Sequence, residues 1–207
     1  MNDRSLQIVL FLSCLVASCA ESTISPDVVE DHGGLMPVDV GNYFLRIEQS
    51  FNENGQLITQ DTVIVSQIMS DTIINRYRWF IRQETPFDVH PVRNLSDGFY
   101  IWAGGPVLLY KYPTYDGDIY DPYGSKSVVT TDSLIMTPEG SFHCILYRAT
   151  QILDTSLINY GERLDEFIAP GIGPIRTDHY WPNSTTGQPY LFERYVYIER
   201  RIVNKTP

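Results

Sequence analysis

A segment rich in glycine and proline near the C-terminal end is the first candidate for chemistry. It reads Ala169-Pro170-Gly171-Ile172-Gly173-Pro174-Ile175-Arg176. Dinucleotide-binding loops need a third glycine and a helix that starts directly after the loop. Arg176 stands at the third glycine position and Pro174 where the helix would begin, which argues against that chemistry. Because glycine tolerates positive φ and proline fixes φ, we interpret Pro170, Gly171, Gly173 and Pro174 as a structural corner between strands; a ligand-gripping loop is the alternative.

Metal-ligating residue types are present, but their spacing is unfavourable. The four histidines form no His-x-His pair, and no cysteine pair assists them; they are His32, His90, His143 and His179. Three aspartates share one loop, at Asp116, Asp118 and Asp121, but the glutamate that closes an EF-hand loop is absent. We therefore interpret this segment as a solvated loop, with a weak Ca²⁺ site as the alternative, and predict neither a metal ion nor a cofactor.

No pattern of an activated nucleophile is found. The chain contains neither a Gly-x-Ser-x-Gly elbow nor a Walker loop. Cys144 follows His143, but adjacent side chains on a strand point to opposite faces of the sheet. We predict that Cys144 is a buried, reduced structural residue. We predict no catalytic residue, so the sequence favours a protein that is not an enzyme; a hydrolase with dispersed catalytic residues stays open.

The N-terminal residues carry the strongest signal. Arg4 precedes an apolar run from Ile8 to Ala17. The run is shorter than the roughly 20 residues of a spanning helix and fits the core of a signal peptide. The run ends in Val16-Ala17-Ser18-Cys19, which resembles the lipobox of bacterial lipoproteins. The resemblance implies cleavage before Cys19 and a diacylglyceryl group on its thiol; secretion with cleavage near Ala20, or a buried N-terminal helix, are the alternatives.

This interpretation divides the chain into three parts. Residues 1–18 are the signal peptide, 19–36 a flexible tether containing Gly33-Gly34, and 37–207 a single β domain. The membrane is then reached through lipid on Cys19. In proteobacterial lipoproteins, an aspartate directly after the lipidated cysteine favours retention in the inner membrane. Residue 20 is alanine, so this resemblance favours the outer membrane over the inner.

Charge excludes one class of partner. The chain has 15 Lys and Arg against 25 Asp and Glu, a formal net charge of -10. Nucleic acid is not an expected partner, because phosphate binding needs a basic face. An anionic lipid surface would repel the domain as well. The negative charge also keeps a domain of this size soluble.

The pattern beyond residue 35 indicates β structure. Aromatic residues make up 13% of the chain, and alternation begins at Tyr43. Asn52–Gly55 predicts a hairpin turn and Ser70-Asp71 a second one, whereas Thr85–Asp97 and Pro113–Ser125 are expected loops. Ala149–Tyr160 is the one segment that could be a short helix. We predict an all-β fold, a curved antiparallel sheet or half-barrel of roughly nine to eleven strands.

Three segments resemble uncharacterised envelope lipoproteins of the Bacteroidota type. Leu35–Phe44 resembles their Pro-Leu-x-x-Gly-Asn-x-Trp opening, with Phe44 in place of Trp. Phe167–Ile175 resembles their Tyr-Ala-Pro-Gly-Val-Gly-Leu-Val segment, with Pro174 in place of Leu, and Pro138–Cys144 resembles a Pro-x-Gly-Thr-Phe-x-Cys strand entry. The resemblance implies a cell-envelope lipoprotein with a curved antiparallel sheet, and it supplies no catalytic residues.

We therefore expect a non-enzymatic binding or interaction module in the cell envelope. Its partner would be an apolar ligand or an envelope protein. Four aromatic residues either line a concave binding face or form a filled core: Trp79, Trp102, Tyr110 and Tyr112. The other open functions are the hydrolase and a structural scaffold, which a flat exposed apolar patch would mark.

Overall fold

A computed structural model describes residues 34–85, 88–120, 125–150, 162–183, 185–186 and 188–201. Within these ranges the regular structure consists of strands, and no helix there is long and apolar enough to cross a membrane. The twelve strands are β1 Tyr43–Phe51, β2 Leu57–Ile74, β3 Tyr77–Thr85, β4 Asp88–Leu95, β5 Gly98–Trp102, β6 Pro106–Lys111, β7 Ile119–Tyr120, β8 Ser125–Thr137, β9 Gly140–Thr150, β10 Arg163–Ala169, β11 Gly173–Pro182 and β12 Pro189–Arg201.

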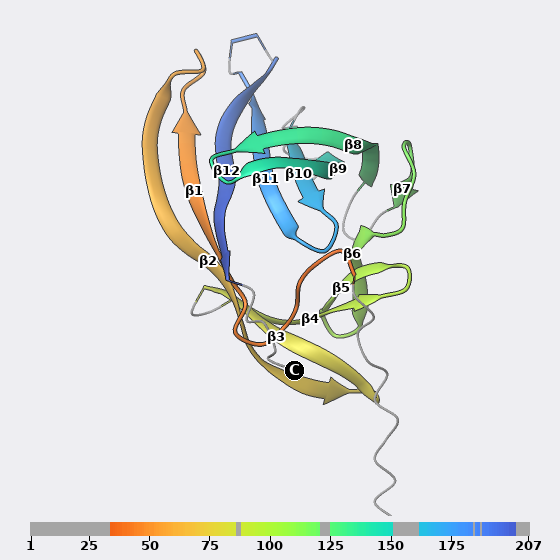
Figure 1. The fold of residues 1–207 in the computed structure, drawn as a ribbon. Coiled ribbons are helices and arrows are strands. Elements are labelled where there is room, and N and C mark those ends of the chain that lie inside the picture. The colour runs from red at the N-terminus through yellow and green to blue at the C-terminus, as the bar shows by residue number, and fades with distance from the viewer. Residues whose placement is uncertain are drawn as a thin grey trace, which may run out of the picture.

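All twelve strands belong to one antiparallel sheet with a simple order. The order is β6-β5-β4-β3-β2-β1-β12-β11-β10-β9-β8-β7. Strands that follow one another in the chain are therefore neighbours, except β6 and β7, which form the two edges. The first and last strands pair in the middle, where Tyr43 lies opposite Arg201. Figure 1 shows β1, β2 and β12 as long strands running side by side.

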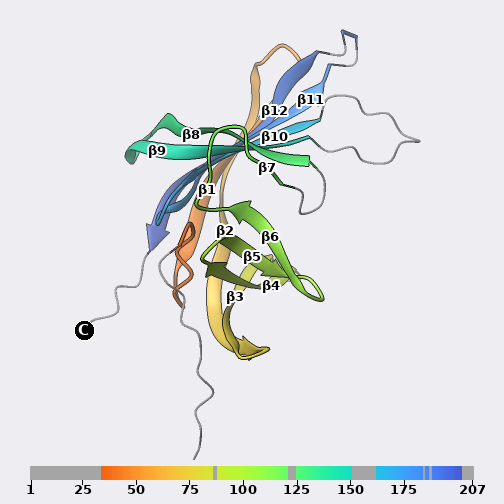
Figure 2. The same ribbon diagram turned by 90° about the vertical axis from the view of Figure 1, so that its right-hand side faces the viewer.

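The sheet curls until its two edges approach each other. Figure 2 shows β6 close to β7, at the ends of the two six-stranded halves. Side chains bridge this seam: the Tyr120 hydroxyl donates to the Leu109 carbonyl at 3.1 Å, and the Tyr147 hydroxyl donates to the Lys111 carbonyl at 2.7 Å. The result is a half-barrel that is almost closed.

The segment from residue 34 to 42 fills part of the interior (Figure 1). Leu35 is 1% exposed, and Met36 is buried beside it. The Asn94 side chain holds Met36 on both sides, accepting from its N–H at 3.2 Å and donating to its carbonyl at 2.8 Å. The Gly171 N–H donates to the Leu35 carbonyl. The sequence predicts a tether up to residue 36, but Leu35 and Met36 pack inside the half-barrel, so the packed domain begins before residue 37.

The predicted fold class is confirmed, and two local predictions are wrong. Part of the expected loop from residue 85 to 97 forms β4. Pro91 is tolerated there because β5 pairs only with Val92–Leu95, so this position has one paired neighbour and needs no N–H on the other side. Strand β4 and the short β7 raise the strand number to twelve. Residues 1–33 and most of the possible helix lie outside the described residues.

The second hairpin turn also lies later than expected. Strand β2 continues through Ser70 and Asp71 with a bulge in its pairing to β3. The turn falls at Asn75 and Arg76, whose φ values are +53° and +69°. Two consecutive positive φ angles are those of a type I′ turn, the form that matches the twist of a two-stranded ribbon.

The outer face of β9–β12 carries a network of arginines and buried aspartates. Asp165 and Asp178 lie opposite each other on β10 and β11. Each carboxylate binds an arginine of the next strand through two nitrogens: Arg148 to Asp165 at 2.7 and 2.8 Å, and Arg194 to Asp178 at 2.7 and 3.2 Å. These contacts compensate the repulsion between the two carboxylates.

Two further arginines repeat one motif on both central strands. Arg163 and Asp165 on β10 match Arg176 and Asp178 on β11, and each arginine also pairs with the aspartate two residues along. Each guanidinium covers an aromatic ring of the opposite strand, Tyr180 at 3.9 Å and Phe167 at 4.3 Å. Aspartate, arginine and aromatic ring thus hold β10 and β11 in register.

Candidate ligand-binding site

A cavity of about 310 Å³ lies inside the half-barrel. Its size is within the lower range of small-molecule pockets. Half of its lining is apolar: Met36, Pro37, Val38, Phe44, Ile68, Val92, Phe99, Leu164, Ile168 and Pro174. The other half is polar: Arg46, Ser66, Arg82, Glu84, Tyr110, Glu166, Thr177, Tyr195 and Tyr197.

Strand alternation delivers these residues to one face of the sheet. Phe44 and Arg46 are two apart on β1, and Tyr195 and Tyr197 are two apart on β12. Successive side chains on a strand point to opposite faces, so residues two apart share a face. Burying polar groups without hydrogen-bond partners is costly, so polar residues at these inward positions favour a cavity that holds water or a bound molecule.

Arg46 is held at the centre of the site. Its guanidinium bonds to Glu48 and lies 4.0 Å from the ring centre of Tyr195. Burial disfavours the charge on Arg46, but Tyr197 and Glu48 outweigh it and raise the pKa of the guanidinium. Burial and a hydrogen bond to Glu193 also raise the pKa of Tyr195. Arg46 therefore remains a cation and Tyr195 a neutral donor at any physiological pH.

Two further ion pairs face the cavity from other strands. Arg82 Nη2 lies 2.6 Å from Glu84, but its buried Nε has no hydrogen-bond partner among the described residues. Across the site Glu166 accepts from the Tyr110 hydroxyl at 2.5 Å and from Lys126 at 2.7 Å. Burial and Glu166 together raise the pKa of Tyr110 well above its ordinary value. The charges of the site therefore balance.

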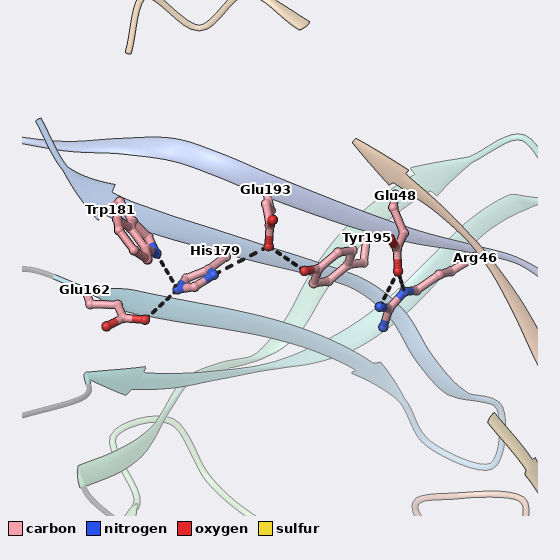
Figure 3. Close-up of polar contacts among 7 residues, drawn as sticks. All are labelled: Arg46, Glu48, Glu162, His179, Trp181, Glu193 and Tyr195. Atoms are coloured by element: carbon pink, nitrogen blue, oxygen red, sulfur yellow. Dashed lines mark hydrogen bonds and ion pairs between the residues drawn. The ribbon is translucent and has the colours of Figure 1, made fainter. Parts of the chain in front are cut away.

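A line of polar side chains leads from the cavity along the inner face, which we call the polar strip: Glu162, His179, Trp181, Glu193, Tyr195, Glu48 and Arg46 (Figure 3). His179 and Trp181 follow the cavity residue Thr177 at two-residue spacing on β11, and His179 lies opposite Glu193 on β12. The Tyr195 hydroxyl donates to Glu193 at 2.5 Å. His179 Nδ1 lies 3.9 Å from Glu193.

His179 has two competing partners at one nitrogen. Its Nε2 lies 2.8 Å from Glu162 Oε1 and 3.0 Å from Trp181 Nε1 (Figure 3). A neutral imidazole nitrogen either donates its hydrogen or accepts one. If Nε2 donates to Glu162, the Trp181 N–H has no acceptor there; if Nε2 accepts from Trp181, Glu162 has no donor there. One polar group in this cluster is therefore available to another molecule.

The residues predicted from sequence fall mostly outside this site. Pro170, Gly171 and Gly173 form the turn between β10 and β11, with φ of +73° and +97° at the two glycines, and Pro174 reaches the cavity. Tyr110 also lines the cavity. Trp79 is buried and packs edge-on against Trp102. The Cys144 side chain is fully buried, as predicted.

The loop aspartates of the alternative Ca²⁺ site have other partners. Asp118 accepts from Lys111 and Thr114, and Asp116 accepts from Thr131. In the part of the chain that the structure describes, no three His, Cys, Asp or Glu side chains gather as a metal site would require. His32 and Asp121 lie outside the described residues.

Sequence inspection missed the partners of His179. The adjacent residues Asp178 and Tyr180 point to the other face of the sheet, so the local sequence around His179 does not show its partners. The signal that could have found the site is the alternation itself: the inward positions of β11 and β12 carry Thr177, His179 and Trp181 and then Glu193 and Tyr195, where a filled core would carry aliphatic residues.

Comparison with known proteins defines the fold. No family model matches the chain, and no curated protein matches it. A solved structure from Bacteroides fragilis, described as an exported protein with a YmcC-like fold, covers 83% of this chain and 100% of its own, with a TM-score of 0.52 at 12% identity. A lipoprotein structure from Parabacteroides distasonis has the same coverage and identity and a lower TM-score of 0.41. The architecture is thus similar to the YmcC-like fold.

Proposed function

We propose that this chain is a lipid-anchored protein of the bacterial cell envelope that binds a small ligand inside its half-barrel and is not an enzyme. Anchoring is supported by the lipobox-like residues before Cys19 and by the signal-like run ahead of them. The structurally similar Bacteroides fragilis protein is described as exported, which agrees with this compartment. Ala20 supports the outer membrane as the destination.

Metabolic labelling with an alkyne fatty acid tests the anchor. Cys19→Ala should abolish the label and leave the precursor uncleaved, because no other thiol follows an apolar run and two small residues. Cys14→Ala is the matched control and should keep the label. Label retained on the Cys19 variant would overturn the assignment.

The proposal that the chain binds a ligand rests on one observation, the cavity with its partly polar lining. The sequence predicts an apolar ligand or an envelope protein as partner, but a wholly apolar molecule would face polar lining groups such as Arg46, Glu84 and Tyr195 without hydrogen-bonding to them, which is costly. The proposed ligand therefore presents both apolar surface and hydrogen-bonding groups. The charge balance of the site disfavours a strongly ionic ligand.

A fluorescent probe can test whether the cavity is accessible. The neutral probe N-phenyl-1-naphthylamine should bind the purified full chain, and Thr177→Trp, which places a large side chain at the cavity wall, should reduce that binding by roughly ten-fold. Thr59→Trp, on an exposed position of β2, is the control and should bind normally. Equal binding by both variants, with unchanged circular dichroism, would refute a cavity site.

Hydrolysis is the second candidate, because two glutamates flank His179. Glycosidases place two carboxylates on either side of the bond that they cleave. Here the imidazole ring itself lies between Glu162 and Glu193, so this space is filled. We therefore expect no turnover of 4-nitrophenyl glycosides or esters. Turnover that is lost in Glu162→Gln would favour the hydrolase instead.

A further inference from the structure

We propose that the ligand is a neutral saccharide that stacks on Trp181 and extends along the polar strip into the cavity. This inference rests on the proposed function and assigns the chemical class of its ligand. Three independent features of the inner face support it: an exposed aromatic platform, a line of groups suited to hydroxyls, and the absence of a net charge in the cavity lining.

The aromatic platform lies at the outer end of the strip. Trp181 is 40% exposed, and the ring of Phe192 lies 4.9 Å from it at an angle of 31°. Tyr190 packs edge-on against Phe192, with 6.4 Å between the ring centres. One face of a pyranose ring presents only C–H groups, so it packs on an exposed indole while its hydroxyls remain free for polar contacts. An indole held rigidly by a second ring costs little entropy on binding.

The strip has the length and direction that such a ligand needs. Trp181 is four residues from the cavity residue Thr177 on the same face of β11, which corresponds to roughly 13 Å of extended strand. His179 lies between them, and Glu193 is its cross-strand neighbour. A ligand of more than one ring can therefore rest on Trp181 and place its far end in the cavity.

The polar groups along this path suit hydroxyls. A hydroxyl both donates and accepts, so it can bridge a carboxylate and an N–H donor. The competition at His179 Nε2 leaves either the Trp181 N–H or the Glu162 carboxylate without that partner. A single ligand hydroxyl would satisfy whichever group is left. Farther in, the cavity lining supplies further polar groups, among them Ser66, Thr177 and Tyr195.

Charge distinguishes a neutral saccharide from an acidic one. Arg46 with Glu48, Arg82 with Glu84 and Lys126 with Glu166 are three balanced pairs. At the outer end, His179 is the one basic side chain that pairs with Glu162 and Glu193 among the described residues, and the whole chain carries -10. A ligand carboxylate would meet this negative end without a spare cation, so uronic acids should bind more weakly than neutral sugars.

The test uses the full chain in a detergent without a sugar headgroup. Tryptophan fluorescence and calorimetry would follow binding of trisaccharides of glucose, mannose, galactose and N-acetylglucosamine, with trigalacturonate as the acidic counterpart. We expect at least one neutral trisaccharide to bind and trigalacturonate to bind more weakly. Trp181→Ala should weaken binding roughly five- to ten-fold through loss of the stacking contact. Tyr115→Ala, an exposed aromatic on the loop before β7, is the matched control and should have no effect.

The outcomes separate this inference from the function on which it rests. If no neutral trisaccharide binds while the fluorescent probe still enters the cavity, the ligand class is wrong and the binding function survives. Stronger binding of trigalacturonate, or equal binding by the Trp181 variant, would also overturn the proposal. If neither sugars nor probe bind, both the saccharide and the cavity site are refuted.

Discussion

The turn between β10 and β11 offers a matched pair of glycines for one stability experiment. Gly171 and Gly173 both have positive φ, at +73° and +97°. An added Cβ at Gly171 would meet nothing within 4 Å. At Gly173 it would lie 3.2 Å from Pro37 Cδ and 3.3 Å from Phe44 Cε1, which belong to the segment inside the half-barrel and to β1. Backbone strain is common to both sites, whereas crowding occurs only at Gly173.

These differences set the expected free energies. Alanine at positive φ costs roughly 1–2 kcal/mol, and about 0.4–1 kcal/mol is offset because alanine restricts the unfolded chain. Gly171→Ala should therefore destabilise by roughly 1 kcal/mol. Crowding adds roughly 1–3 kcal/mol at Gly173, because Pro37 and Phe44 are held by the fold. For a domain of this size, about 2–4 °C of melting temperature is lost per kcal/mol.

Thermal melts of the two variants, followed by circular dichroism without ligand, test this reasoning. Gly171→Ala should melt a few degrees below the wild type, and Gly173→Ala clearly lower. Urea titrations with unchanged m-values would confirm that stability, rather than compactness, has changed. Wild-type melting of both variants would refute the structural corner and favour the ligand-gripping loop. An equal loss of melting temperature in both variants would show that Pro37 and Phe44 do not crowd a side chain at position 173.

Three further predictions concern buried polar groups. Asp178→Asn should lower the free energy of unfolding by roughly 2 kcal/mol, measured by urea titration. This is less than the cost for a fully buried ion pair, because Arg194 is partly exposed. An unchanged urea midpoint would contradict a stabilising role for the arginine–aspartate network. Cys144 should react with a thiol reagent only after denaturation, and rapid native labelling would contradict its burial. Partial burial and Asp97 raise the pKa of Tyr100 from 10.0 to about 12, so the unfolded chain ionises first and stability falls as pH rises from about 10 to 12. Tyrosinate absorbance at increasing pH should therefore lag behind free tyrosine, and a single titration near pH 10 without unfolding would contradict this.

Much of the strand pattern could be predicted from local sequence. Alternation from Tyr43 and the Asn54-Gly55 pair located β1 and its hairpin, and the structure shows Gly55 with φ of +74° there. The local signal failed where tertiary pairing overrides it. Pro91 predicts a loop by itself, but β3 supplies a partner on one side and the strand forms. Ser70-Asp71 predicts a turn, but the long ribbon with β3 continues past it.

The site could not be predicted because its members meet only through sheet pairing. His179 on β11 lies near Glu162 and Glu193. Glu193 is on β12 and Glu162 directly precedes β10, and these are the two strands that flank β11 in the sheet. Which strands become neighbours depends on the closure of the whole sheet, and no local propensity encodes that. The cavity likewise depends on the depth to which residues 34–42 enter the half-barrel, which the composition of that segment does not reveal.

The pairing of β1 with β12 has a consequence for how the chain folds. Each six-stranded half is a series of hairpins, which can form in microseconds from neighbouring residues. Joining the halves requires Tyr43 to find Arg201, so a loop of roughly three quarters of the chain must close first. We expect this joining to be the slow step. Until it occurs, β1 and β12 are both open edges, exposed to wrong partners. A chain that emerges from a membrane N-terminus first would remain in this vulnerable state until its last strand has emerged.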